Sequence, residues 1–327
     1  MAKKVSDHYC GIGGQAVLEG IMMKNKDAYA IAVRKPNGVI EVKKEEYKSK
    51  ADSKWKQIPF IRGVFNFVDS LTMGMHCLTY SASFYEEDGP EEETKFDKAA
   101  NKLFGEKTEE VLTGLTVAFS IVMAIALFMI LPYFLAELLS KVVANDTLLA
   151  LFEGIIRILI FLSYVVLISL MKDIHRVYQY HGAEHKCINC LEKGRILNVE
   201  NVRKSSRLHK RCGTSFLLFV VFISVILFFF IRVEQPVLRL VVRLLLIPVI
   251  AGISYEIIRL AGKTNNIFVR IISAPGLWLQ KLTTKEPDDD MIEVAIAAVE
   301  AVFDWKEYFK TEFSYDVDGT ALEQEKV

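Results

Sequence analysis

Long uncharged apolar runs dominate the middle of the chain. Residues 111–136 contain no charged side chain, and residues 213–231 form a second uncharged run rich in Phe, Val, Ile and Leu. A helix needs about 20 apolar residues to cross the hydrocarbon core of a bilayer, because it rises ~1.5 Å per residue. Both runs are therefore predicted to be transmembrane helices.

Two further apolar runs carry charges. Residues 148–171 are apolar except for Glu153 and Arg157, which lie four apart and can pair on one helix face. Residues 236–261 contain three arginines and a glutamate, so their charge-free length alone makes a poor span. Arginine side chains near a helix end can reach the headgroups, and we therefore expect four spans within 111–261.

The distribution of basic residues orients these four spans. The connection 140–147 has one lysine, whereas residues 172–211 carry ten Lys or Arg against four acids. Basic connections between spans remain in the cytoplasm. The loop 172–212 and both termini are then cytoplasmic, so the protein is expected to be multi-pass with its N-terminus and C-terminus inside.

Outside the long apolar runs, the spacing of apolar residues changes along the chain. Alternating apolar residues on either side of Asn37-Gly38 predict a hairpin, and "GGQAVLEGIMM" before it predicts a third strand, giving a β-meander within residues 1–56. Apolar residues then recur every three or four positions, which predicts an amphipathic interfacial helix over 57–85. An acidic linker follows over 86–110, and residues 262–327 read as an interfacial segment and a C-terminal cytoplasmic helix that starts at the acid run 288–290. The expected fold is thus mainly α, with a small sheet.

Composition narrows the class of protein. The formal net charge is zero, which gives no argument for nucleic-acid binding, so the bilayer and an unidentified substrate or protein are the expected partners. The five cysteines are odd in number and scattered, which does not fit a secreted disulfide framework. The first residues lack the apolar core of a cleaved signal peptide. The sequence does not define an oligomeric state.

One stretch of the basic loop has the spacing of a metal site. In "YHGAEHKCINCLEKG", His181, Glu184 and His185 form the pattern H-x-x-E-H. Two imidazoles at i and i+4 on a helix face the same divalent ion, and an adjacent carboxylate can take a proton from an activated water. We therefore expect Glu184 to be a general base and the two histidines to be metal ligands.

Further ligands lie at the other end of the same loop. His209 and Cys212 stand three apart just before the third span. Three imidazole nitrogens and one thiolate make a set suited to zinc. If one of the four only supports the others, a coordination position stays open for water. The predicted cofactor is a divalent metal, with zinc favoured by the donor set.

Other interpretations of this stretch stay open. The histidines could be ordinary polar residues of a juxtamembrane helix, because a five-residue pattern is weak. A redox pair at Cys187-x-x-Cys190 lacks the usual βαβ context. A zinc knuckle could combine those two cysteines with His209 and Cys212. On a continuous helix, however, both cysteines point away from the face that carries His181.

Several charged residues lie in apolar sequence segments, where a charge needs an opposite charge or a hydrogen-bond partner. Salt bridges are the ordinary explanation, and a place around a polar site is the alternative. Glu192 shares the helix face of His181 by its spacing. The residues in this group are Glu19, Arg62, Glu192, Glu256 and Arg259.

The chain resembles a known family in several distinctive segments. These are "GGQAVLEGIMM", "IRGVFNFVDSL", "YHGAEHK", "ENVRKSSRLHKRCGTSF" and "APGLWLQKLTTKEPDD", and together they are similar to the YqhQ-like bacterial membrane proteins, a family of unknown function described as predicted metal-dependent enzymes. The likeness covers about 90% of the chain, from residue 10 to about 303. It implies a polytopic protein of the bacterial inner membrane, and it names no substrate.

The resemblance also bears on single residues. The pattern of the family matches the present chain at His181, Glu184, His185, His209 and Cys212, whereas the position of Cys187 is often not cysteine in relatives. That weighs against the zinc knuckle. The leading hypothesis is a cytoplasm-facing membrane metalloenzyme, a zinc-type hydrolase of a peptide or lipid-linked bond. The alternative is a non-enzymatic membrane scaffold, transport or assembly component, with a structural metal site or none.

Overall fold

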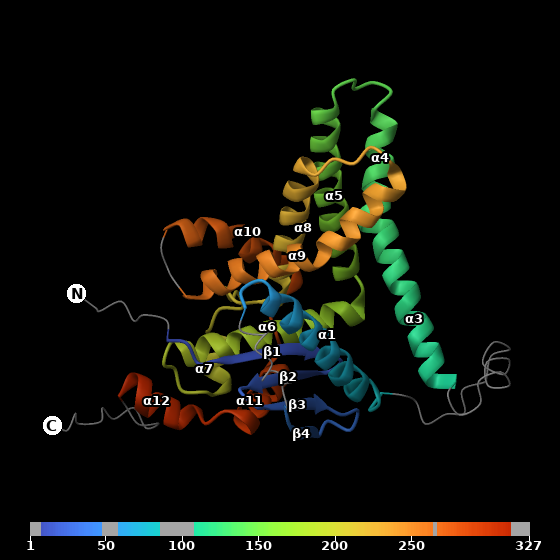
Figure 1. Cartoon of the computed structure of the whole chain (residues 1–327). Helices are drawn as coiled ribbons and strands as arrows, with labels where there is room; N and C mark the ends of the chain where they lie inside the picture. Colours follow the sequence, from blue (N-terminus) through green and yellow to red (C-terminus); the bar gives the residue numbers. More distant parts are fainter. Residues whose placement is uncertain (1–7, 48–57, 86–107, 264–266, 315–327) are drawn as a thin grey trace. The chain divides into compact units, whose positions relative to one another are not determined.

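The structure is a computed structural model that describes residues 8–47, 58–85, 108–263 and 267–314 (Figure 1). The acidic stretch 86–97 lies outside these residues. The chain forms two compact units, and each is described by itself. One comprises residues 1–85, 165–220 and 248–327, and the other comprises residues 86–164 and 221–247.

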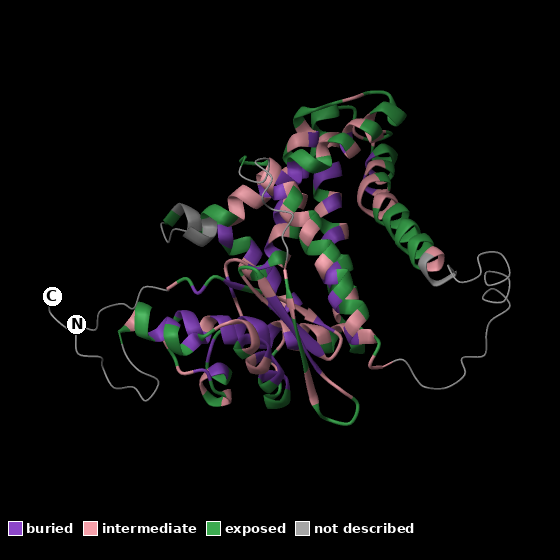
Figure 2. Cartoon of the chain, turned by 60° about the horizontal axis from the view of Figure 1, so that its bottom comes forward, coloured by how far each residue is buried: buried purple, intermediate pink, exposed green. Residues whose placement is uncertain are grey.

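Four helices are long and apolar enough to cross a membrane, as predicted: Val111–Leu139, Asp146–Ser169, Gly213–Phe230 and Pro236–Leu260. The first consists of α3 (Thr108–Ile125), a π-helical turn η4 (Ala126–Ile130) and α4 (Leu131–Leu139). The others are α5 (Asp146–Ser169), α8 (Gly213–Phe230) and α9 (Pro236–Lys263). Most of the residues of α3 for which burial is described are exposed (Figure 2), which is the pattern expected of a helix that meets lipid.

The N-terminal sheet has four antiparallel strands in the order β1-β2-β3-β4. They are β1 (Ile12–Val17), β2 (Gly20–Asn25), β3 (Ala28–Arg34) and β4 (Ile40–Glu46). The segment predicted as one third strand is therefore a hairpin. Leu18 and Glu19 form its two-residue turn, and Glu19 adopts the left-handed conformation with φ 49°. Such turns are usually recognised in sequence by Gly or Asn, so a Leu-Glu pair does not predict one.

Helices cover both faces of this sheet (Figure 1). Helices α6 (Lys172–Glu192) and α11 (Asp289–Val302) pack on one face, and α1 (Ile61–Ala82) packs on the other. Because successive side chains of a strand alternate between faces, neighbours enter different cores. Toward α6 and α11 lie Ile21, Met23 and Ala32, and toward α1 lie Met22, Ile31 and Val33.

Two helices of the same unit turn apolar residues outward. The buried residues of α1 are small, namely Gly63, Gly74, Cys77 and Ser81. Its predicted apolar stripe is exposed at Phe65, Val68, Leu71, Met75 and Leu78. Helix α10 (Ile267–Thr283) likewise buries Ser273, Gln280 and Thr283 while exposing Ile271, Ile272 and Trp278. In water this arrangement would be unfavourable, so both faces are suited to lipid contact.

Candidate metal centre

Helix α6 carries the predicted motif on a continuous helical segment. It begins after Met171, which is extended, and the chain leaves it at Gly194, whose φ is 64°. His181, Glu184 and His185 all lie within it. Cys187 and Cys190 are buried in the hydrophobic core instead, and the thiol of Cys190 donates to the carbonyl of Arg195 at 3.4 Å. Both cysteine side chains are therefore packed in the hydrophobic core.

Three donor atoms converge where α6 meets the start of α8. The ligand atoms of His181, His185 and Cys212 all lie within 4.8 Å of one another. The Nε2 atom of His181 is 3.1 Å from the sulfur of Cys212. The sulfur is also approached by the backbone N–H of Thr214 in the first turn of α8, at 3.4 Å. Residues 31 positions apart in sequence are thereby brought together.

Backbone carbonyls fix the orientation of both imidazoles. The Nδ1–H of His181 donates to the carbonyl of Thr283 at 2.9 Å, and the Nδ1–H of His185 donates to the carbonyl of Arg207 at 2.7 Å. A carbonyl can only accept, so each neutral ring carries its proton on Nδ1 and its lone pair on Nε2. This is the arrangement by which metal-binding histidines are held in proteins.

The arrangement of the three donor atoms could hold a cation between them. Two Nε2 lone pairs face one sulfur, and a thiol has at most one proton to share with them. Burial lowers the pKa of His185, partly offset by Cys212, which keeps the ring in the neutral form that binds metals. A divalent ion would satisfy all three donors at once. Nitrogen and sulfur donors together are compatible with zinc and other transition metals.

Glu184 is buried between α6 and β1. An ideal Cβ on Gly14 would lie 2.9 Å from the Cδ atom of Glu184 and 2.8 Å from the backbone carbonyl oxygen of Met22, so a larger residue there would force these groups to shift. Burial raises the pKa of this carboxyl to about 7, although the neighbouring His181 and the backbone N–H of Gly14 lower it. The carboxyl is thus poised to gain or lose a proton near neutral pH.

His209 lies beside the three donors and has other partners. Its ring centroid is 5.7 Å from that of His185, while its Nε2 is 3.4 Å from a carboxylate oxygen of Glu192. Glu192 also pairs with Arg211 and accepts from the backbone N–H of Cys10 at 3.4 Å. Of the four predicted ligands, three form the donor group, and His209 with Glu192 forms a buried polar pair next to it.

Residues that the sequence analysis did not single out hold this loop in place. Lys186, only 4% exposed, donates to the carbonyls of Arg203 and Ser205, each at 2.9 Å. The side-chain amide of Gln280 on α10 bonds the backbone N–H and carbonyl of His209 at 2.8 and 2.7 Å. These are side chain to backbone bonds, which have no spacing rule in the sequence.

Three of the four remaining predicted polar residues, Glu19, Arg62 and Glu256, form ion pairs. Glu19 pairs with Arg176 and accepts from the hydroxyl of Tyr180 at 3.2 Å. Glu256 pairs with Arg62, the Nε atom of which donates at 2.6 Å, while Arg259 is exposed. These pairs have the structural role that the sequence analysis gave as the ordinary explanation.

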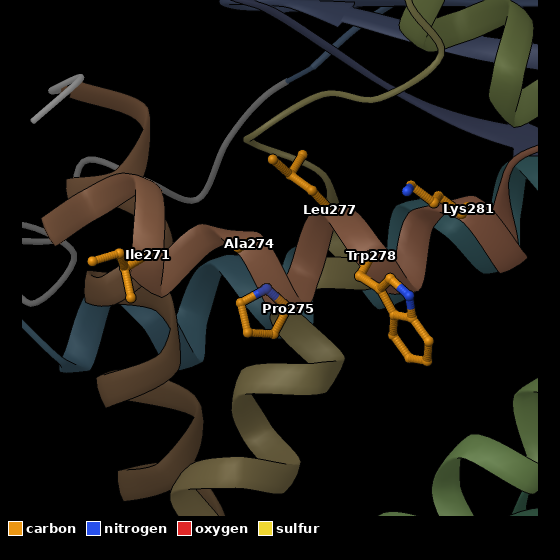
Figure 3. Close-up of a pocket in the computed structure, with 6 residues that line it drawn as sticks. All are labelled: Ile271, Ala274, Pro275, Leu277, Trp278 and Lys281. Atoms are coloured by element: carbon orange, nitrogen blue, oxygen red, sulfur yellow. The ribbon is translucent and has the colours of Figure 1, made fainter. Parts of the chain in front are cut away.

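A shallow groove runs along the outer side of α10 (Figure 3). Its lining is apolar except for one cation at the C-terminal end, and consists of Ile271, Ala274, Pro275, Leu277, Trp278 and Lys281. The same helix ends at Thr283, the carbonyl of which holds His181. The helix that lines the groove therefore also contacts the donor group through this carbonyl.

The comparisons with known proteins give a family and no activity. The family described as "Protein of unknown function (DUF1385)" matches residues 58–305. The chain is 37% identical over 294 residues to the "Uncharacterized protein YqhQ" of Bacillus subtilis (strain 168), which covers 87% of this chain and 89% of that protein. No solved structure matches the chain.

Proposed function

We propose that this chain, which belongs to the DUF1385 family of proteins of unknown function, is a metal-dependent hydrolase of the bacterial inner membrane with its site facing the cytoplasm. The membrane location is supported by four helices of sufficient length and hydropathy. The cytoplasmic orientation is supported by the ten basic residues of the loop 172–211.

One observation carries the proposal. His181, His185 and Cys212 offer three donor atoms within 4.8 Å of one another. Structural zinc sites use four protein ligands, whereas catalytic sites use three and leave one position for water or substrate. A bound divalent ion would supply Lewis acidity and lower the pKa of a water molecule. A set of three donors therefore supports a catalytic site over a structural one.

Glu184 completes the chemistry as the general base. It follows His181 by three residues on the same helix and is buried, and its pKa of about 7 suits proton transfer at neutral pH. In the proposed step Glu184 accepts a proton from water as the water oxygen bonds to the substrate carbonyl or phosphoryl centre. The same proton then passes to the leaving group, and Glu184 returns to its charged form.

The outward apolar faces of α1 and α10 favour a substrate that resides in the membrane. Phe65, Leu71 and Trp278 are each at least 41% exposed, and α10 leads directly to Thr283 beside His181. An acyl or polyprenyl chain could lie along such a face while its polar group reaches the donor atoms. A lipid-linked bond is therefore the favoured substrate, and a membrane-bound peptide is the alternative.

A non-enzymatic role has its own support. His185 is 1% and Cys212 is 6% exposed, which is the burial of a site that holds a fold together. In this second candidate the ion would tie α6 to α8 in a scaffold or transport component. The donor residues are the same in both candidates, so the two differ in what Glu184 does.

Metal content tests the site itself. We expect zinc in the purified wild-type protein at about one ion per chain, and loss of it in His181→Ala, His185→Ala and Cys212→Ser. His175→Ala is the matched control, because His175 is exposed on the same helix. His209→Ala should retain zinc, since its Nε2 bonds Glu192. Equal, substoichiometric metal in wild type and His185→Ala would refute the metal site.

The variant Glu184→Gln separates the enzyme from the scaffold. It keeps the size of the side chain and its ability to accept from Gly14, and it removes the base. We expect it to retain zinc and to fail in complementing a deletion of the gene. If it binds zinc and restores the wild-type phenotype, the hydrolase proposal fails and a structural site remains.

A further inference from the structure

A group of charged side chains lies buried within the second unit. Glu153 on α5 accepts from Arg157 at 2.8 Å on the same helix. The same carboxylate oxygen is 2.7 Å from the Nη2 atom of Arg243 on α9. The three residues are 9%, 4% and 7% exposed, respectively.

These residues lie well inside the spans. Arg157 follows the first residue of α5 by 11 positions, which corresponds to roughly 16 Å along the helix axis. Arg243 follows the first residue of α9 by seven positions, or roughly 10 Å. Ionisable side chains at such depth are costly and commonly mark a binding site or a pathway.

The charges do not balance. Two guanidinium groups share one carboxylate, so the group carries one excess positive charge. Both guanidinium carbons lie over the ring of Phe228, at 4.7 and 4.9 Å from its centroid. An aromatic face attracts a cation without neutralising it. Among the described residues, Glu153 is the one acid that forms a salt bridge with either arginine.

One donor of the group is also left over. The Nε–H of Arg157 is buried and has no hydrogen-bond partner among the residues that the structure describes. A buried donor on a charged group is normally satisfied by a partner. The unpaired N–H lacks a hydrogen-bond acceptor, and the excess charge lacks a negative counter-charge. An anion with acceptor oxygens would supply both.

We propose that Arg157, Arg243 and Glu153 form a binding site for a phosphate group of one net negative charge. Guanidinium forks match the oxygens of phosphate in geometry and charge, and one such anion would balance the excess charge. The phosphate can belong to the headgroup of an anionic phospholipid or be free in solution. The site does not depend on the metal centre or on any hydrolytic activity.

The test measures binding to the full-length, delipidated protein in a neutral detergent. The probes are inorganic phosphate, dioctanoyl phosphatidylglycerol, and dioctanoylglycerol as the lipid that lacks phosphate. We expect the Kd for the phosphate-containing probes to rise at least about tenfold in Arg243→Gln. Arg239→Gln is the matched control, because Arg239 lies one turn away on α9 over the ring of Tyr133.

The variant Glu153→Gln distinguishes an anion site from an ion pair that only holds helices together. Removing the internal carboxylate frees both arginines, so phosphate or phosphatidylglycerol should bind tighter than to wild type. Binding of phosphatidylglycerol alone identifies the headgroup as the source, and binding of inorganic phosphate identifies a free anion. The proposal is overturned if neither binds, if dioctanoylglycerol binds equally well, or if Glu153→Gln weakens binding. The last comparison decides the question even if Arg243→Gln does not fold.

Discussion

Gly182 lies where α6 packs closely against the chain beyond α10. An ideal Cβ at this position would lie 2.0 Å from the backbone carbonyl oxygen of Lys285, and a backbone atom cannot swing aside as a side chain can. Because Gly182 follows His181 directly, the close approach also sets the distance between that ring and the carbonyl of Thr283. The glycine thus serves both packing and the donor group.

The substitution Gly182→Ala is expected to lower the free energy of unfolding by ~1–3 kcal/mol and to reduce zinc content. Thermal unfolding in detergent and metal analysis would measure both effects. Gly114→Ala is the control, because no atom lies within 4 Å of an ideal Cβ there. Equal unfolding temperatures of the two variants would contradict the close approach.

Four cysteine thiols should be inert in the folded protein. Burial raises the pKa of Cys10 to about 12 and those of Cys77 and Cys190 to about 11, and it raises the pKa of Cys187 well above its usual range. The thiolate is the reactive form, so a raised pKa leaves almost none of it at pH 8.

Iodoacetamide at pH 8 should therefore leave these four thiols unmodified in the native protein and label all of them in denaturant. Mass spectrometry of tryptic peptides would report each site. Rapid native labelling of Cys187 or Cys190 would show that the pair is accessible and would revive the redox interpretation.

At this scale the sequence indicates which side chains could be donors better than it indicates which residues support them. The spacing of His181 and His185 identified two donors because helix geometry is regular, and the same geometry excluded Cys187. The roles of Thr283 and Arg207 could not be predicted. They contribute backbone carbonyls, and any residue type offers one.

The amphipathic helices α1 and α10 show what the helical spacing of apolar residues can and cannot predict. Period 3.6 predicted an apolar stripe on α1, and the stripe exists. In a soluble protein such a stripe would face the core, but here the small residues Gly63 and Cys77 do so instead. Which face turns inward depends on the solvent around the helix, and this cannot be read from the period alone.

Trp278 offers a direct measurement of where α10 lies. The expected depth of its ring is the headgroup region, because an indole combines an apolar body with a polar N–H. A variant that retains only this tryptophan should be quenched more by lipids brominated near the headgroup than by lipids brominated near the bilayer centre. A variant that retains only Trp305, which is 5% exposed, is the control and should not be quenched. Equal fluorescence of the Trp278 variant in all lipids would place α10 outside the bilayer.

At the scale of the whole molecule, the four spans were predicted because hydropathy over about 20 residues is a strong signal. The packing of α11 on the sheet was not foreseen. It joins residues more than 250 positions apart, as in the bond from Arg34 to the carbonyl of Asp290, 2.7 Å long. Contacts of that range depend on shape complementarity, and a single sequence carries no pattern for them.

The orientation in the membrane can be tested with introduced cysteines, since the five native ones are buried. Val142→Cys lies between the first two spans at a position 87% exposed, and Lys204→Cys replaces a side chain 64% exposed in the basic loop. A membrane-impermeant maleimide should label Val142→Cys in intact spheroplasts and Lys204→Cys only after permeabilisation. The reverse pattern would place the basic loop outside.

The bond between Thr283 and His181 links helix α10 to the donor group. Thr283 is the last residue of α10, the outer face of which is apolar, so a force that moves this helix also moves the carbonyl that orients the imidazole. If α10 lies in the bilayer and the donor group binds zinc, as proposed, lipid thickness and headgroup charge would change the metal affinity. Zinc retention should accordingly be higher in nanodiscs than in micelles, and the protein would sense the state of its membrane through one hydrogen bond.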